Sequence, residues 1–440
     1  MVKFWNSTEE AKQRASREIS ALKSFSNSKE WDQKPYSAAA DVTTVYFASE
    51  QMSTCNSSDV SGAIAITHHP RRYTTFEGAL SHGTTFTHVP GYISKFLLNG
   101  VDVSREITKK HGDDDREKVM SFWCHYFEQF ITSNEDLTDQ SKDSTSSSSP
   151  AINELREITS REIENNNSLV KHLQDSIRGD FHFTSFCHGN LEAQNIYVRP
   201  LTKKEHDESM EDREFYGKGT PVTLAAPVNQ YPNSPLWVDL GSFLATIFRS
   251  YVASCVREQE ARCGRMALVK PIEKEEGEKK VRKYVVYWQQ KSGYAAHMLT
   301  EKASMWNHMR TYLAYLLQET FNDILDGLIR DDTPPEAWQT TLRLSCQYAA
   351  ILMLHHGINQ TPESDAHIDY SPEFDSPPDN PDSVLSKAGQ VKMATGCCKL
   401  ARELHAEKGT NAEGDNTPEA FTQTVISSYL QYLDQHLFTE

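Results

Sequence analysis

The sequence lacks any long hydrophobic run. A helix that spans a bilayer needs roughly 20 consecutive apolar residues. The richest stretch, residues 236–256, is interrupted by Asp239 and Arg249. We therefore expect no transmembrane segment.

Positive charge is also scarce. The chain has 45 Lys and Arg residues against 61 Asp and Glu residues, a formal net charge of −16. A protein that binds nucleic acid through the phosphates needs a basic surface. The composition therefore predicts that nucleic acid is not among the partners.

Cysteine is sparse, and no two cysteines form a C-x-x-C pair. Eight cysteines among 440 residues cannot build a disulfide scaffold, so we expect reduced thiols packed as small apolar groups. The first 20 residues have no continuous apolar segment, and Glu9, Glu10 and Glu18 argue against a transit peptide. We expect a cytoplasmic location, with an organellar one (mitochondrion or plastid) as the alternative.

The first part of the chain is predicted to combine a helix, strands and turns. Ser7-Thr8-Glu9-Glu10 is a capping box for a helix that runs to about Phe25. Alternating residues predict strands at 42–47 and 62–67, with turns up to Pro90, and apolar spacing predicts a helix over 117–131. Residues 133–150 are polar and Ser-rich, which predicts a mobile linker.

The second part is predicted to be a helical domain around a small β element. The expected helices are 152–177, one with a buried stripe from Phe243 to Cys255, 302–329, 333–356, 391–404 and 417–437. Short strands are expected within 183–199 and at 222–226. Residues 270–283 are interpreted as a charged insertion, and residues 361–382 as a loop.

Two motifs resemble a known family. Phe-Cys-His-Gly-Asn-Leu-Glu-Ala-Gln-Asn-Ile-Tyr-Val at residues 186–198 resembles the catalytic loop of aminoglycoside phosphotransferases and, above all, methylthioribose kinases, which read His-Gly-Asp-Leu-His before a strand. Val-Asp-Leu-Gly-Ser-Phe-Leu-Ala-Thr-Ile-Phe at residues 238–248 is similar to the segment after the metal-binding turn of methylthioribose kinases. The resemblance implies a protein-kinase-like phosphotransferase fold for residues 150–440.

The sequence departs from that family where the chemistry would occur. Asn190 stands at the family's catalytic aspartate, and an amide cannot act as a general base at neutral pH. Glu192 replaces the following histidine. If residues 222–227 form the strand that normally ends in the metal-binding Asp-Pro-Glu, Ala225 and Ala226 replace the magnesium ligands. Site residues are therefore a degenerate loop, with His188 as a structural histidine.

A second alignment makes residues 236–239 the strand that ends on the metal aspartate. Asn195 and Asp239 would then hold magnesium, with ATP as the cofactor of a divergent small-molecule kinase. In the first alignment Asp239 is instead expected to cap the helix that it opens, by accepting the N–H of Ser242 or its neighbour. Residues 347–352 contain no arginine where the family's sugar-binding arginine pair is found.

The N-terminal lobe is predicted to be reduced and altered. Only residues 1–44 precede the strand that would enter the hinge, and they contain neither a Gly-rich phosphate loop nor a Val-Ala-x-Lys strand. Residues 78–85 have the glycine spacing of a P-loop but carry Thr84 where the lysine must be. Three further clusters are better explained by local structure than as ligand sites. Residues 68–72 are interpreted as a basic turn, and residues 363–382 as a solvated loop. Residues 355–356 are interpreted as a helix C-terminus with favourable dipole placement.

The sequence thus predicts an α+β fold with an N-terminal helix and arm (residues 1–44), a reduced N-lobe and hinge region (45–132), a Ser-rich linker (133–150) and a kinase-like C-terminal lobe (151–440). The leading hypothesis is a catalytically inactive pseudoenzyme that serves as an accessory subunit with other protein subunits as partners and no cofactor. The alternatives are the ATP- and Mg²⁺-dependent kinase and a regulator with a residual small ligand in the cleft.

Overall fold

The computed structural model is an α+β protein in which helix predominates. It describes residues 2–5, 9–27, 41–42, 45–53, 61–67, 73–111, 116–142, 157, 161, 167–178, 183–201, 221–229, 231, 233–263, 265–276, 279–290, 296–329, 335–359, 373–378, 380–381, 384–405 and 431. Across these residues no helix is both long and apolar enough to cross a bilayer.

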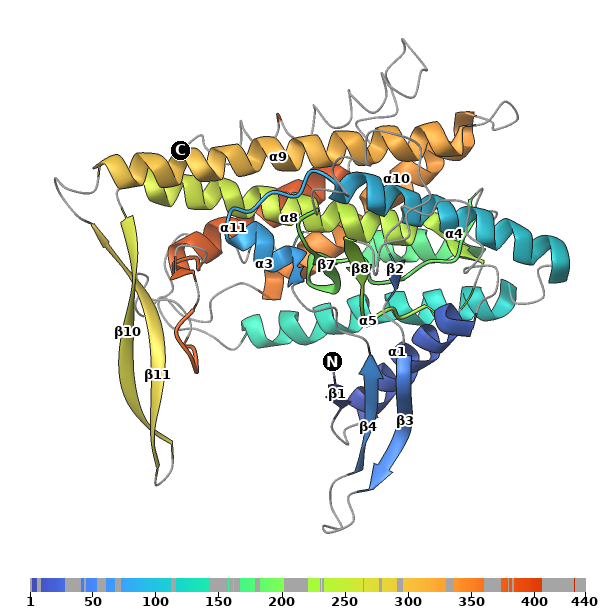
Figure 1. Cartoon of the computed structure of the whole chain (residues 1–440), viewed down its shortest axis with the longest axis horizontal. Helices are drawn as coiled ribbons and strands as arrows, with labels where there is room; N and C mark the ends of the chain where they lie inside the picture. Colours follow the sequence, from blue (N-terminus) through green and yellow to red (C-terminus); the bar gives the residue numbers. More distant parts are fainter. Residues whose placement is uncertain are drawn as a thin grey trace.

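Long helices form the body of the molecule (Figure 1). The helices are α1 (Glu9–Asn27), α3 (Phe76–Ser81), α4 (Val89–His111), α5 (Arg116–Lys142), α8 (Leu236–Arg262), α9 (Ala296–Leu328), α10 (Pro335–Asn359) and α11 (Lys387–His405), with a 3-10 turn, η1 (Ala193–Asn195). Residues 167–178 are also helical.

Helix α8 is the central helix of the body. Every residue from Leu236 to Phe248 is buried, which is the pattern of a helix that is covered on all sides. Helices α9, α10, α11 and α4 all contact it. The stripe predicted from Phe243 to Cys255 is therefore confirmed as core, and the first turn of α8 is enclosed by the rest of the fold.

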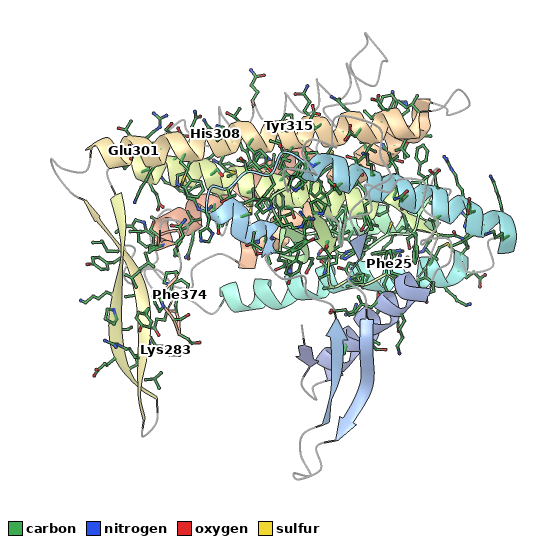
Figure 2. All side chains as sticks on the ribbon, viewed as in Figure 1. Phe25, Lys283, Glu301, His308, Tyr315 and Phe374 are labelled. Carbon is green, nitrogen blue, oxygen red and sulfur yellow. The ribbon has the colours of Figure 1, made fainter. Side chains whose placement is uncertain are left out.

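Helix α9 has one buried and one exposed face. Trp306 and Leu313 are buried in the core. Glu301, His308 and Tyr315, which are spaced by seven residues, lie along the outer face of α9 in Figure 2. This arrangement is typical of an amphipathic helix at the edge of a bundle.

A small four-stranded sheet lies against the helices, in the order β2-β8-β7-β5. Its strands are β2 (Asp41–Val42), β5 (Thr74–Thr75), β7 (Ile196–Val198) and β8 (Val222–Leu224). β7 and β8 are antiparallel, with Ile196 opposite Leu224. The short strands predicted within 183–199 and at 222–226 are thus confirmed.

Two β structures extend from the helical body (Figure 1). One is the antiparallel sheet of β1 (Val2–Trp5), β4 (Ser61–Thr67) and β3 (Val45–Ser53), which lies beside α1. The other is the hairpin of β10 (Arg265–Glu276) and β11 (Lys279–Gln290). Tyr284 of β11 forms a backbone bridge to Phe374, and the ammonium of Lys283 lies 2.7 Å from a carboxylate oxygen of Asp375 (Figure 2).

Several predicted elements are confirmed. The first helix, the strands at 42–47 and 62–67, the helix from 117, and the helices at 302–329, 333–356 and 391–404 all correspond to observed elements, with ends that differ by a few residues. None of the cysteines that the structure describes forms a disulfide, and most of them are buried. The α+β class is the part of the predicted fold that the structure bears out.

Other local predictions are wrong. Turns are expected up to Pro90, but residues 76–81 form α3 and α4 begins at Val89. Pro90 lies in the first turn of α4, where its missing N–H costs nothing. Within the charged insertion predicted at 270–283, residues 270–276 and 279–283 lie in two paired strands that the sequence does not predict. Helix α5 continues to Lys142, so the first part of the expected linker is helical. The expected helix at 417–437 lies outside the described residues except for Gln431.

A single hydrophobic cluster extends from Leu22 to Leu404. It contains residues on both sides of the expected linker, including Phe96 of α4 and Leu244 of α8. Helix α4, which falls in the expected N-lobe and hinge region, also packs against α9. The two sides of the expected linker therefore share one core.

Candidate functional site

The segment of residues 186–198 is fixed at both ends. Before it, β6 (Thr184–Ser185) pairs with β9 (Ser234–Pro235), which leads directly into α8. After it, β7 belongs to the small sheet. The segment therefore lies against the first turn of α8, next to Asp239.

Asp239 anchors this loop through its carboxylate. One carboxylate oxygen accepts the backbone N–H of His188 and the other accepts that of Gly189, both at 2.6 Å. The side chain is fully buried, which raises its pKa to about 7 although both N–H bonds favour the charged form. Both oxygens of Asp239 are thus engaged in holding the loop.

His188 is a buried residue of the loop. Its side chain is fully buried next to the ring of Phe96, at 6.4 Å between centroids. Burial lowers its pKa to about 3, and the nearby backbone groups of Ala225 and Asn190 only partly oppose this effect. The imidazole is therefore neutral at physiological pH, and it is enclosed by the protein.

Gly189 is required by the close packing of the loop. Its φ of 80° lies in the left-handed region, which side chains other than glycine rarely adopt. A Cβ at this position would lie 2.9 Å from Cγ2 of Val228 and 3.1 Å from the ring of Trp123. The loop is thus pressed against the segment that follows β8.

Asn190 lies beside the end of β8. Its side-chain N–H contacts the carbonyl of Ala226 at 3.4 Å, and its own carbonyl accepts the side-chain N–H of Asn195 at 3.0 Å. The N–H of Ala225 donates to the carbonyl of Asn195 at 2.8 Å. Among these four residues the side chains are amides and methyl groups, so the cluster offers no base and no anionic metal ligand of its own.

Ala226 has an unusual backbone conformation. Its φ of 58° is the one positive value among the described residues other than glycine. Alanine gains nothing in this conformation, whereas Asn, Asp and Gly tolerate it. The strain is retained at the point where β8 approaches Asn190, and such local strain is concentrated at functional sites.

Glu192 turns away from this cluster. Its carboxylate lies 3.6 Å from the guanidinium of Arg249 on α8, and it accepts the side-chain N–H of Gln194 at 3.4 Å. The acidic residue of the motif thus links the loop to the middle of α8.

A buried amide network supports the same loop from behind. The side-chain N–H of Asn229 donates to the carbonyls of Cys187 and Tyr231 at 3.0 and 2.8 Å, and its oxygen accepts from Ser234. The hydroxyl of Ser234 also accepts the indole N–H of Trp123 at 3.0 Å. These residues escaped the sequence prediction, although the run of Pro, Asn and Ser over 227–235 is a turn signal.

The observed role of Asp239 differs from the capping role expected in the first alignment. α8 begins at Leu236, three residues before Asp239, and the carboxylate accepts backbone N–H groups of the loop rather than that of Ser242. These contacts use one lone pair on each of the oxygens that the alternative magnesium pair with Asn195 would need. Over the described parts of the chain, no three His, Cys, Asp or Glu side chains gather as metal ligands.

The remaining candidate sites are placed as follows. In the P-loop-like stretch, Gly78 lies inside α3 and Gly83 follows its C-terminus, so the glycines do not precede a helix N-terminus. His356 lies in the last turn of α10, but burial lowers its pKa to about 3, so the expected favourable charge at that helix end is absent. Residues 68–72 and most of 363–382 lie outside the described residues.

No protein-family model matches this sequence, and no curated protein matches it.

Proposed function

We propose that the protein is a catalytically inactive, kinase-like pseudoenzyme that acts as an accessory subunit of a larger protein assembly. The observation that carries the proposal is the neighbourhood of Asn190. An aspartate base and an acidic metal ligand would be needed here for phosphoryl transfer, whereas the described neighbours are Asn195, Ala225 and Ala226.

The use of Asp239 supports the same proposal. A magnesium ligand must direct at least one oxygen to the ion. Both oxygens of Asp239 accept short backbone N–H bonds beneath the loop, and the group is fully buried. The chain thus keeps the loop in shape while the groups that would carry out the chemistry are replaced.

The role as a subunit is supported by the extended β structures. The β10–β11 hairpin pairs over its full length of 12 residues per strand, and it projects from the helical body (Figure 1). A long hairpin that is anchored mainly at one end is suited to reach a neighbouring protein. No cofactor is needed for this role.

Thermal unfolding with ATP and Mg²⁺ tests the loss of catalysis. We expect the midpoint to remain unchanged, because a ligand stabilises only a protein that binds it. ADP production should equal that of buffer. Saturable stabilisation, together with ADP release that disappears in an Asn190→Ala variant, would refute the proposal.

The subunit role needs a separate experiment. Affinity purification of the full chain should recover the same partners at constant ratios, and a variant in which a short Gly-Ser linker replaces residues 265–290 should lose some of them. Isolation of the intact chain as a lone monomer would count against this part of the proposal.

A further inference from the structure

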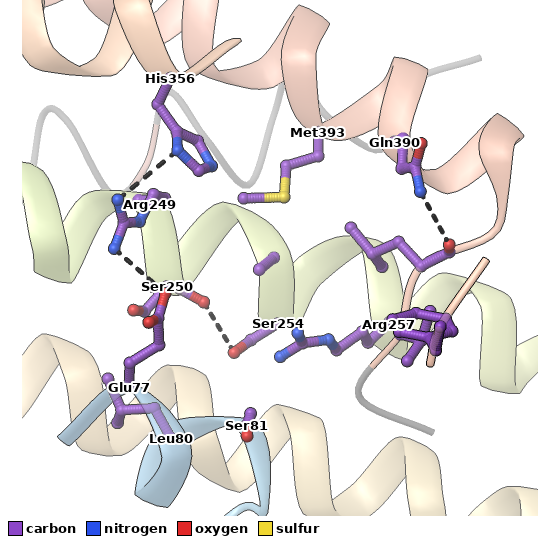
Figure 3. A pocket seen from close by; sticks show the side chains of 14 residues that line it. Glu77, Leu80, Ser81, Arg249, Ser250, Ser254, Arg257, His356, Gln390 and Met393 are labelled. Atoms are coloured by element: carbon purple, nitrogen blue, oxygen red, sulfur yellow. Dashed lines mark hydrogen bonds and ion pairs between the residues drawn. The ribbon is translucent and has the colours of Figure 1, made fainter. Parts of the chain in front are cut away.

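A pocket of about 310 Å³ lies on the side of α8 that faces α3 and α11 (Figure 3). Its walls come from α3, α8, the end of α10 and α11, together with Phe374, Val384 and Leu385. The volume is at the lower end of the range for small-molecule sites, roughly 300–1,000 Å³. The pocket therefore suits a small metabolite better than a nucleotide.

One wall of the pocket is a polar face of α8. Arg249, Ala253 and Arg257 follow each other at intervals of four residues, so they share one face of the helix. Ser250 and Ser254 lie on the same wall. In Figure 3 the guanidinium of Arg257 extends along the helix towards Ser254, and that of Arg249 lies at the other end of the wall.

Two arginines lie in the pocket wall of this acidic protein. Among the lining residues, Glu77 is the only acidic side chain, and His356 is neutral because burial lowers its pKa to about 3. Burial lowers the pKa of Arg257 to about 10, so this side chain keeps its charge at neutral pH. The lining thus has two guanidinium groups against one carboxylate, while Glu192 and Glu260 interact with the same arginines from outside the lining.

Arg249 is only loosely engaged by its neighbours. Its guanidinium nitrogens lie 3.5 Å from Glu77, 3.6 Å from Glu192 and 3.5 Å from the ring of His356. Tight charge-assisted hydrogen bonds measure about 2.7–2.9 Å. Arg249 therefore retains the capacity to hold a further anion. Arg257 is held differently, because its guanidinium lies 4.7 Å from the centroid of the Trp306 ring.

The remaining lining of the pocket is largely apolar. It is formed by Leu80 of α3 and Met393 of α11, which lie on two sides of α8 in Figure 3, together with Phe374, Val384 and Leu385. A ligand with a charged group at one end and an apolar part at the other would match both kinds of lining.

We propose that this pocket binds a small organic anion, with its phosphate or carboxylate group between Arg249 and Arg257. Guanidinium groups present planar pairs of N–H donors that match both of these head groups. The apolar part of the ligand packs against Leu80, Leu385 and Met393. This inference does not depend on the proposed function, because the pocket uses a different part of α8 from the loop around Asn190.

The experiment is isothermal titration calorimetry of the full chain with phenyl phosphate, benzoate and benzyl alcohol. Ionic strength is held constant, because salt screens such interactions. We expect saturable binding of at least one of the two anions, and binding of the neutral alcohol at least about tenfold weaker. Which anion binds more tightly identifies the head group.

Three variants locate the binding. Arg249→Gln removes one guanidinium, and Ala253→Met fills the pocket between the two arginines without altering either of them. Each should weaken anion binding by about tenfold or more. The matched control is Arg262→Gln, which removes a cation from the same helix at a position whose side chain is 68% exposed and pairs with Glu258.

The proposal is overturned if neither anion binds saturably below about 10 mM, a very weak affinity. It is equally overturned if the neutral alcohol binds as well as the anions, or if Ala253→Met and Arg262→Gln bind alike. Because Ala253→Met leaves both arginines in place, it keeps the test decisive even if Arg249→Gln does not fold.

Discussion

Helix α8 carries two groups of charged residues that are used in opposite ways. At its first turn, Asp239 is fully buried, and both of its carboxylate oxygens accept backbone N–H groups of the loop. In its second half, Arg249 lines a pocket and makes only contacts of 3.5 Å or longer. The carboxylate of Asp239 therefore serves the fold itself, whereas the guanidinium of Arg249 remains able to bind a ligand.

The difference shows where ligand chemistry can still occur in this chain. The loop around Asn190 is held by Asp239, Gly189 and the Asn229 network, yet the hydrogen-bond partners described for the Asn190 side chain and carbonyl include no acidic or basic side chain. The α8 face with Arg249 and Arg257 carries charge but matches no motif identified in the sequence. A well-anchored loop and a site able to bind a ligand are therefore separate properties here.

The largest expected effect comes from removal of the loop anchor. Asp239→Ala leaves two buried N–H groups, those of His188 and Gly189, without their acceptor. Each unsatisfied buried group costs about 1–3 kcal/mol, so we expect the free energy of unfolding to fall by about 3 kcal/mol or more. Urea unfolding followed by circular dichroism measures this change.

The control for this variant is Asp175→Ala, because the side chain of Asp175 is 71% exposed and pairs only with Arg178 at 3.0 Å. Its effect should stay within about 0.5 kcal/mol. A loss below about 1 kcal/mol in Asp239→Ala would show that the loop holds its shape without the carboxylate, and the contrast between the two parts of α8 would fail.

The second prediction concerns pH, because both parts of the comparison contain a buried neutral histidine. His188 and His356 have folded-state pKa values of about 3, well below the ordinary value of 6.5. The unfolded chain therefore binds protons that the folded chain does not. Their contribution to stability is present above pH 6.5 and is lost as the pH falls towards 3.

Asp239 acts in the opposite direction. Its folded-state pKa of about 7 exceeds the ordinary value of 3.8, so its contribution is present below pH 3.8 and is lost as the pH rises through 7. The pH effect of two histidines on the free energy of unfolding is larger than that of one carboxyl group, so we expect this free energy to fall as the pH is lowered from 6.5 to 4.

His356→Gln should reduce the slope of the unfolding free energy against pH by up to about 1.4 kcal/mol per pH unit. The exposed control His125→Gln should leave the slope unchanged, and equal slopes in all three proteins would contradict the prediction.

The sequence predicts individual helices and strands better than it predicts how they pair and pack. The short strands predicted within 183–199 and at 222–226 are observed as β7 and β8, because strand propensity and turn residues act over a few neighbours. Around residues 270–283 the many charged residues give no strand signal. The two strands there are stabilised by pairing with each other, and a pattern read over a few neighbouring residues does not detect such pairing. The start of α4 is not predicted, because Pro90 and Gly91 are typical turn residues although here they lie in the first turn of the helix.

The candidate site was predictable only as a segment. The motif around His188 predicts the loop as a candidate site, but no rule of spacing shows that Asp239, 51 positions later, accepts the backbone N–H of His188. The pocket was not predictable at all. Arg249 and Arg257 come from one helix, yet Leu80 and Met393, which complete the pocket, are separated by most of the chain.

The smallest expected effect concerns two neighbouring alanines at the end of β8. Ala226 has a φ of 58°, which glycine adopts without strain, whereas Ala225 does not have a positive φ and is 4% exposed. Relief of the left-handed conformation, about 1 kcal/mol, offsets the entropy that glycine loses on folding, about 0.5–1 kcal/mol. Ala226→Gly should therefore leave the free energy of unfolding unchanged or raise it by up to about 0.5 kcal/mol.

Ala225→Gly is the matched control, because it removes the same methyl group from the adjacent position with no strain to relieve. We expect it to lower the free energy of unfolding by about 1 kcal/mol. Parallel urea titrations of the two variants resolve this difference. If both variants are destabilised equally, Ala226 is not strained in solution, and the loop around Asn190 has relaxed from the geometry that places it beside β8.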